Sequence, residues 1–373
     1  MRRAIMAIVL GLLPPGALCA QSTWTTVIQT RSLNLDAELL GGDSLGAGGA
    51  DISQTSIRTT ITAFVTPALS VVVSGGAGLS DLQGFAGASE AQGLTDTRVK
   101  LFYRIAGGRV LLGAGVVAPT GLHSLEPDEL STAAGVWSPL LGFPLKRLGE
   151  GWGGDVSGSV AFPLGDRTTL GLGAGYYARG EYDLSANPVS QYRPGNEISS
   201  TAAFDFIEER TGLRLALALR SFAADRLNGA DYIDQGDQIE GTARFWWRGD
   251  RLGMALTGHA VAKGDNRFFV SAARGAATAE DPGGRSVFFG GRLSWQASGR
   301  LSIFGEATGG LFTDYEAALV PVNGRSWTAG PGLGWQPGPN LETSVRFALT
   351  GGSAEDGGSY DGYDVLAMVA VKR

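Results

Sequence analysis

The sequence predicts an all-β fold, an antiparallel transmembrane β-barrel of about 16 strands that occupies residues 21–373 as one domain. Runs of alternating apolar and polar residues fill most of the chain, and short turns join them in pairs. Long loops rich in Gly and Asp connect one pair to the next. Short turns at one end and long loops at the other are typical of outer-membrane barrels. The seven short turns lie at 66–68, 107–109, 165–167, 210–212, 249–251, 298–300 and 337–340.

The alternation follows the two-residue period of a β-strand. In 213–220, Leu occupies every odd position, whereas Arg214 and Arg220 lie on the even positions. Successive strand residues point to opposite faces, so such a strand has one apolar and one polar face. A soluble β-sandwich would alternate in the same way, and the position of the aromatic residues favours the barrel instead. Rings that gather at one height, shortly before the turns, predict an interfacial girdle. Its members are Tyr103, Phe162, Phe206, Trp247, Trp295 and Trp335.

Seven turns join fourteen strands, and further strands near 23–33 and 362–372 give sixteen. Bacterial barrels have even strand numbers, so fourteen is the main alternative. With both termini in the periplasm, the short turns are periplasmic and eight long loops are extracellular. We expect these loops near 34–53, 79–94, 119–150, 182–195, 225–235, 264–284, 312–324 and 352–361.

Residues 1–20 have the features of a secretory signal peptide. Arg2 and Arg3 precede an apolar run that is too short to span a bilayer, and Ala20 is a suitable cleavage residue. The chain has a single Cys, Cys19, so the mature protein would contain no disulfide. The predicted location is the outer membrane of a Gram-negative bacterium, with lipid, lipopolysaccharide and the barrel-assembly machinery as partners. The net charge of −6 gives no indication of a nucleic-acid partner.

The polar face of the strands predicts a charged inner wall. Opposite charges on neighbouring strands can pair there and stiffen the wall. Inward glycines such as Gly115 and Gly332 either clear space for a loop or a solute, or allow the strands to bend. The predicted lumen-lining residues are Arg58, Arg98, Lys100, Arg104, Asp155, Arg179, Asp205, Arg214, Arg220, Glu240, Arg244, His259, Arg292, Glu306, Glu342 and Arg346.

The longest loop, 119–150, is unusually apolar. An apolar segment on the outer side of a barrel needs something to cover it. We therefore expect this loop to fold into or over the mouth, either as an apolar port for a solute or as a lid packed against neighbouring loops. The residues predicted to form it are Pro119, Leu130, Trp137, Leu140, Leu141 and Phe143.

No catalytic or metal site is expected. The sequence has two histidines, His123 and His259, and no nucleophile motif surrounds either of them. Metal ions require clustered His, Cys or carboxylate ligands. Acidic loop residues such as Asp231 and Asp234 read as solvated carboxylates, with Ca²⁺ binding as the alternative. We expect no cofactor and no enzymatic activity.

Three short segments carry a family resemblance. The run VLLGAGVVAPTG at 110–121, the triplet at 96–98 and the segment at 192–197 resemble outer-membrane proteins linked to the phenol meta-cleavage degradation pathway. The resemblance implies a barrel, related to hydrophobic-compound channels, that passes aromatic or other hydrophobic molecules. Hydrocarbon channels of that kind carry an N-terminal plug, whereas here a strand begins almost at the cleavage site. Such barrels commonly end in an aromatic residue, whereas the last residue here is Arg373.

Three functions therefore compete. The apolar loop and the resemblance favour an outer-membrane channel for passive uptake of a small hydrophobic or aromatic solute. The charged inner wall favours a general diffusion porin. The long loops favour a surface or structural barrel without a transport function.

Overall fold

The computed structural model describes residues 22–36, 39, 49–84, 89–122, 124–126, 129–183, 191–269, 277–281, 283–313, 323–355 and 357–372. The predicted signal peptide at 1–20 and His123 lie outside these residues. The barrel strands are β1 (Ser22–Leu35), β2 (Ala50–Phe64), β3 (Leu69–Gln83), β4 (Ser89–Leu94), β5 (Thr97–Ile105), β6 (Val110–Ala118), β7 (Gly153–Pro163), β8 (Thr168–Arg179), β11 (Glu197–Ile207), β12 (Thr211–Phe222), β15 (Gln238–Arg248), β16 (Leu252–Lys263), β19 (Arg285–Gln296), β20 (Leu301–Thr313), β21 (Gly324–Gly338), β22 (Leu341–Ala354) and β23 (Ser359–Lys372).

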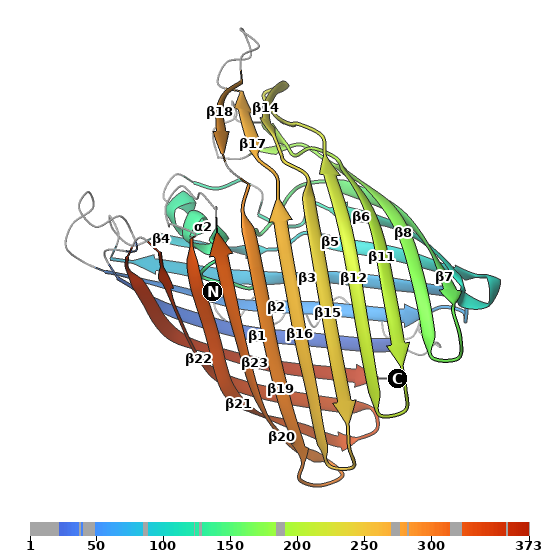
Figure 1. Cartoon of the computed structure of the whole chain (residues 1–373). Coiled ribbons are helices and arrows are strands. Elements are labelled where there is room, and N and C mark those ends of the chain that lie inside the picture. Colours follow the sequence, from blue (N-terminus) through green and yellow to red (C-terminus); the bar gives the residue numbers. More distant parts are fainter. Residues whose placement is uncertain are drawn as a thin grey trace.

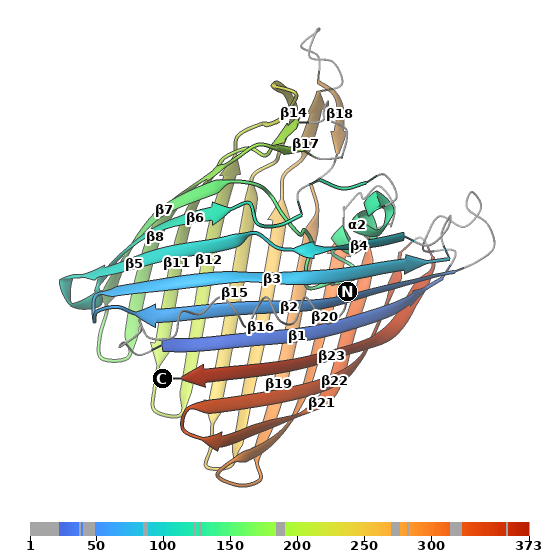
Figure 2. The same cartoon turned by 180° about the vertical axis from the view of Figure 1, so that it is seen from behind.

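These strands form one closed antiparallel sheet (Figures 1 and 2). Each strand pairs with the next, and β1 pairs with β23 from Thr23↔Lys372 to Leu35↔Tyr360. Both β4 and β5 pair with β3, at opposite ends of it, so they form one interrupted strand. The predicted barrel of 16 strands is therefore confirmed.

All seven predicted short turns connect neighbouring barrel strands at one end, which we call the turn end. A 3-10 helix, η2 (Ala106–Gly108), forms the turn between β5 and β6. The longer connections lie at the opposite end, the loop end. Some predicted loops were too long, because β3 continues to Gln83, β4 occupies 89–94, and β22 and β23 leave only 355–358 between them. Among the described residues, no helix is both long and apolar enough to span a bilayer.

The two faces of the barrel wall differ as the alternation predicts. One face carries exposed apolar side chains such as Leu101, Leu215 and Phe347 along the length of the strands. The other face, the inner face, includes Gln54, which contacts the long loop after β6. The six residues of the predicted girdle lie on the outer face near the turn end, where all except the half-buried Phe206 are exposed. Their contact with lipid headgroups stays a prediction.

A second sheet caps part of the loop end (Figure 1). It consists of β9 (Tyr182–Asp183), β10 (Gln191–Arg193), β13 (Asp225–Leu227), β14 (Ala230–Asp234), β17 (Asn266–Phe269) and β18 (Ala277–Asp281). Asp225 is 1% exposed and accepts hydrogen bonds from the Tyr192 hydroxyl, the Gly195 amide and the Gln235 side chain. Burial, and then the hydrogen bond to this carboxylate, raises the pKa of the Tyr192 phenol. The sequence analysis read these segments as plain loops.

Gly330 lies where the backbones of β21 and β22 approach closely. A Cβ at this position would overlap the carbonyl oxygen of Phe347 and the Cα of Ala348. Gly330→Ala should therefore destabilise the barrel by about 1–3 kcal/mol, the usual effect of overpacking. Gly305→Ala on β20 is the matched control, since a Cβ there meets no atom within 4 Å. The measurement is the urea unfolding midpoint of the refolded proteins in detergent, and equal midpoints for the two variants would contradict the prediction.

Candidate functional site at the mouth of the barrel

The segment 119–152, which we call the mouth loop, has both ends fixed to one carboxylate. Asp96 lies in the break between β4 and β5, and its two oxygens accept hydrogen bonds from the backbone amides of Gly121 (2.9 Å) and Glu150 (2.5 Å). Thr120 adds a hydrogen bond from its side chain to the carbonyl of Thr95. A carboxylate that accepts backbone N–H bonds forms strong, charge-assisted contacts. The interruption of the strand therefore holds the base of the loop.

Further polar contacts hold the middle of the loop against the inner face. The Gln54 side chain is 1% exposed, and its amide binds both the carbonyl and the amide of Leu145 at 2.9 Å, as another backbone would. The loop contains the helix α2 (Glu129–Trp137), whose buried Thr132 donates to the carbonyl of Ser89 on β4. Buried polar groups need such partners, and here they fix the loop to β2 and β4.

A hydrophobic cluster fills the space between the mouth loop and the inner face. Leu140 and Leu141 of the loop are 1% and 0% exposed, and the hydroxyl of Tyr360 on β23 donates to the carbonyl of Leu140 at 2.8 Å. We call this cluster of buried apolar residues the socket. The sequence analysis had assigned the inner face of the wall to polar residues. The cluster consists of Leu33, Leu35, Leu39, Ala50, Ile52, Leu82, Val136, Leu140, Leu141, Phe143, Phe312, Ala354 and Tyr360.

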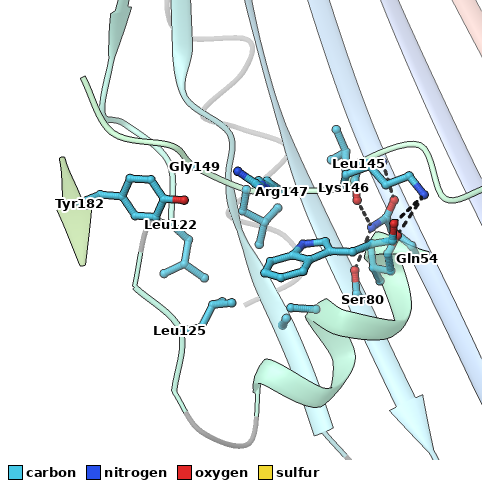
Figure 3. Close-up of a pocket in the computed structure, with 14 residues that line it drawn as sticks. Gln54, Ser80, Leu122, Leu125, Leu145, Lys146, Arg147, Gly149 and Tyr182 are labelled. Carbon is cyan, nitrogen blue, oxygen red and sulfur yellow. Dashed lines mark hydrogen bonds between the residues drawn. The ribbon is translucent and has the colours of Figure 1, made fainter. Parts of the chain in front are cut away.

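Next to α2, the mouth loop leaves a cavity of about 170 Å³, which we call the apolar cavity (Figure 3). Most of its lining is aliphatic or aromatic. In Figure 3, Leu122, Leu125 and Tyr182 lie on one side of it, and Gln54 and Ser80 on the other. The lining residues are Gln54, Ser80, Ala91, Leu122, Leu125, Ala133, Val136, Trp137, Leu145, Lys146, Arg147, Leu148, Gly149 and Tyr182.

The predicted loop residues divide between these two environments. Leu140, Leu141 and Phe143 pack in the socket, against residues of the barrel strands. Trp137 instead lines the apolar cavity, where the Arg147 guanidinium stacks on its ring. Pro119 lines a separate cavity near Tyr182 at the base of the loop. Leu130 belongs to α2, but its side chain is not among the described ones. Leu122 and Leu148 were not singled out, although their apolar character inside the loop was visible in the sequence.

The register places the predicted lumen-lining residues on the inner face, and many of them form ion pairs with the next strand or with the strand beyond it. Lys100 reaches Asp155 at 2.9 Å over Gly115, which has no side chain to obstruct it. The other pairs are Arg179–Glu197, Arg214–Asp205, Arg220–Glu240, Arg346–Glu306, Arg346–Asp364 and Lys372–Glu342. Their role in a solute path stays a prediction.

A second group of wall cations lacks a carboxylate partner among the described residues. Arg98 stacks on Tyr177, Arg104 on Phe64, and Arg244 on Trp246. Arg292 lies 3.6 Å above the centre of the Phe304 ring. Arg58 donates to the side-chain oxygen of Gln29 at 3.1 Å. The sequence analysis expected ion pairs here, and the aromatic neighbours were the missed signal.

Inward glycines make room for neighbouring side chains of the wall. A Cβ at Gly115 would lie 2.5 Å from the Asp155 carboxylate, and one at Gly332 would overlap the Phe304 ring. The sequence analysis had considered a loop, a solute or a bend for these positions. Instead, the Lys100–Asp155 ion pair occupies the space beside Gly115, and the Phe304 ring occupies the space beside Gly332.

Of the two histidines, His259 is the one that lies in the described part of the chain. His259 accepts or donates a hydrogen bond at 2.9 Å to Glu240 and stacks on Phe288. Within the described part of the chain, no group of three or more His, Cys, Asp or Glu side chains could hold a metal ion.

Comparison with known proteins gives distant structural neighbours. No family model and no curated protein matches the chain. The outer-membrane channel DcaP of Acinetobacter baumannii is 10% identical, with 97% of this chain and 100% of that chain covered and a TM-score of 0.44. OpdK of Pseudomonas aeruginosa is 14% identical, with coverages of 96% and 100% and a TM-score of 0.44. The monoaromatic hydrocarbon channel CymD is 12% identical, with coverages of 95% and 89% and a TM-score of 0.41. We transfer neither family nor function from such low scores.

Lys146 should titrate well below an ordinary lysine. Its ammonium group donates to the carbonyls of Val136, Trp137 and Ser138 at the end of α2. Burial of this group, and then repulsion from Arg31, lowers its pKa to about 8. Lys146 as a whole residue is exposed, but its pKa depends on the ammonium group, which the three carbonyls surround.

The measurement is a pH titration of the lysine Nζ resonances in ¹⁵N-labelled protein, with Lys146→Gln to assign the signal. The folded-state pKa lies below the unfolded value, so between pH 8 and 10.5 Lys146 carries more bound proton in the unfolded chain than in the folded protein. The free energy of unfolding should therefore rise with pH across this range. A midpoint near 10.5 would contradict the prediction.

Proposed function

We propose that this chain is an outer-membrane channel for passive uptake of small hydrophobic or aromatic compounds, exported with a signal peptide cleaved near Ala20. The observation that carries the proposal is the apolar cavity at the loop end, between the mouth loop and the barrel wall. Binding sites for small molecules are concave and mostly apolar, with a few polar groups that fix orientation. The Arg147 guanidinium and the Gln54 amide are such groups in this lining.

The outer face supports the membrane location in this proposal. Exposed apolar side chains on neighbouring strands, such as Leu215, Leu217, Ile239 and Leu256, form a surface that water would not favour. A bilayer covers such a band, and closure of the sheet satisfies its backbone in lipid. The partners in this proposal are outer-membrane lipid, lipopolysaccharide and the barrel-assembly machinery.

Filling the apolar cavity should slow uptake of hydrophobic solutes. Ala133 on α2 is 8% exposed and lines the cavity, so Ala133→Phe places a ring inside it. We expect a several-fold lower rate of labelled toluene uptake in cells of a porin-depleted host that produce this variant, compared with the unsubstituted protein.

The matched control is Ala202→Phe, which makes the same change on the outer face of β11, opposite Leu217. Heat-modifiable mobility in gels shows whether each variant is folded. Equal toluene uptake by folded Ala133→Phe and by the unsubstituted protein would sink the proposed function.

The conductance distinguishes this channel from a general diffusion porin. The mouth loop packs into the barrel, so the intact protein should show a small single-channel conductance in a planar bilayer. Leu140→Asp with Leu141→Asp puts two charges into the socket, where both leucines are almost fully buried. Buried unpaired charges are costly, so the loop should leave the socket and the conductance should rise. A large, steady conductance before the substitutions would favour the porin.

A further inference from the structure

The apolar cavity is the first of three cavities that follow one another along the inner face. A middle cavity of about 390 Å³ shares Leu145, Arg147, Leu148 and Gly149 with it. A third cavity of about 380 Å³ shares Arg98, Glu150 and Tyr177 with the middle one. The segment 145–149 of the mouth loop therefore contributes to the lining of both the apolar cavity and the middle cavity.

The carboxylates of the middle cavity are already engaged. Asp96 uses both oxygens on backbone amides of the mouth loop. Glu150 lies 3.5 Å from Arg147 of the same loop. Both carboxylates keep their negative charge, but among the described residues neither lies within ion-pair distance of the two arginines that the barrel wall contributes.

Those two wall arginines are Arg58 of β2 and Arg98 of β5, and both line the middle cavity. Within the described residues, neither lies within ion-pair distance of a carboxylate. Arg58 has one neutral partner, the Gln29 oxygen, and its Nε atom is buried without a hydrogen-bond partner. Arg98 lies against the Tyr177 ring, 5.4 Å from its centre. Two partly desolvated guanidinium groups therefore line the cavity without a direct ion pair, and with Arg147 the lining has three arginines against two carboxylates.

A carboxylate is the group that best satisfies this arrangement. A guanidinium presents planar, paired donors that fit the two oxygens of a carboxylate, and the resulting hydrogen bonds are charge-assisted. A neutral hydrocarbon would pass the same arginines without satisfying them. The neighbouring apolar cavity, in turn, accommodates a ring or a short alkyl chain, since most of its lining is aliphatic or aromatic.

We infer that the solute is an amphipathic anion, an aromatic or short acyl carboxylate whose apolar part occupies the apolar cavity before Arg58 and Arg98 receive its carboxylate. This inference rests on the proposed uptake function and narrows its substrate class. In this inference, Arg58 and Arg98 select the substrate, and the wall cations that form ion pairs have a structural role.

The test is calorimetric binding of two matched probes to the refolded protein in detergent at pH 7. One probe is 3-phenylpropionate, and the other is 3-phenylpropionamide, which has the same skeleton without the charge. Charged hydrogen bonds contribute about 1.5–3 kcal/mol, so the carboxylate should bind roughly ten- to a hundredfold more tightly. Arg58→Gln with Arg98→Gln should remove this preference. Arg98→Gln alone should reduce it, and serves if the double variant does not fold.

The control variant, Arg109→Gln with Arg300→Gln, removes the same two charges from exposed turns and should keep the preference. Equal binding of the two probes by the unsubstituted protein would overturn the inference while the proposed uptake of hydrophobic compounds stands. Acetate that binds as tightly as 3-phenylpropionate would also overturn it, because the apolar part would then contribute nothing. If neither phenyl probe binds and Ala133→Phe leaves toluene uptake unchanged, the proposed function fails as well.

Discussion

The closure of the sheet between β1 and β23 is the constraint on which the rest of the structure depends. Once these strands pair, the sheet closes, and among the described residues β4 is the barrel strand that pairs on one edge only, with β3. Leu122 and Thr132 of the mouth loop donate hydrogen bonds to carbonyls of β4. Closure also fixes which face of every strand points inward, because side chains alternate strictly. The mouth loop then lies inside a closed wall, where its own backbone must find partners. Asp96 and Gln54 supply them, and Lys146 does so at the end of α2.

The mouth loop does two different things on its two sides, and this explains why an apolar loop has both a socket and a cavity. Toward β20, β22, β23 and β1 it is packed densely, with Leu140 and Phe143 almost fully buried. Toward β3, β4 and Tyr182 the packing is incomplete and a cavity remains. A loop held firmly on one side can preserve an empty space on the other. The mouth loop therefore has one side packed against the wall and another side that lines a cavity.

The strands, turns and faces were predictable because a two-residue period and short turns are local signals. The socket was not predicted, although its signal exists: Leu33, Ile52 and Phe312 are apolar residues at inner positions near the loop end. Reading every inner position as polar hid that departure. The second sheet, at the loop end, was not predicted because its strands are only two to five residues long. Such strands are too short for a period to be visible, and their pairing depends on long-range contacts such as Tyr192 with Asp225.

The charges of the wall follow from the same geometry. A cation with a carboxylate across the strand, such as Lys100, has its charge compensated and its side chain fixed. Arg98 and Arg292 have rings as neighbours instead, and a ring orients a guanidinium without neutralising it. Stacked arginines therefore keep most of their attraction for an anion, while paired ones do not. Of Arg98 and Arg292, Arg98 lines the middle and the third cavity. A guanidinium without an ion-pair partner among the described residues therefore lies where the proposed solute would pass.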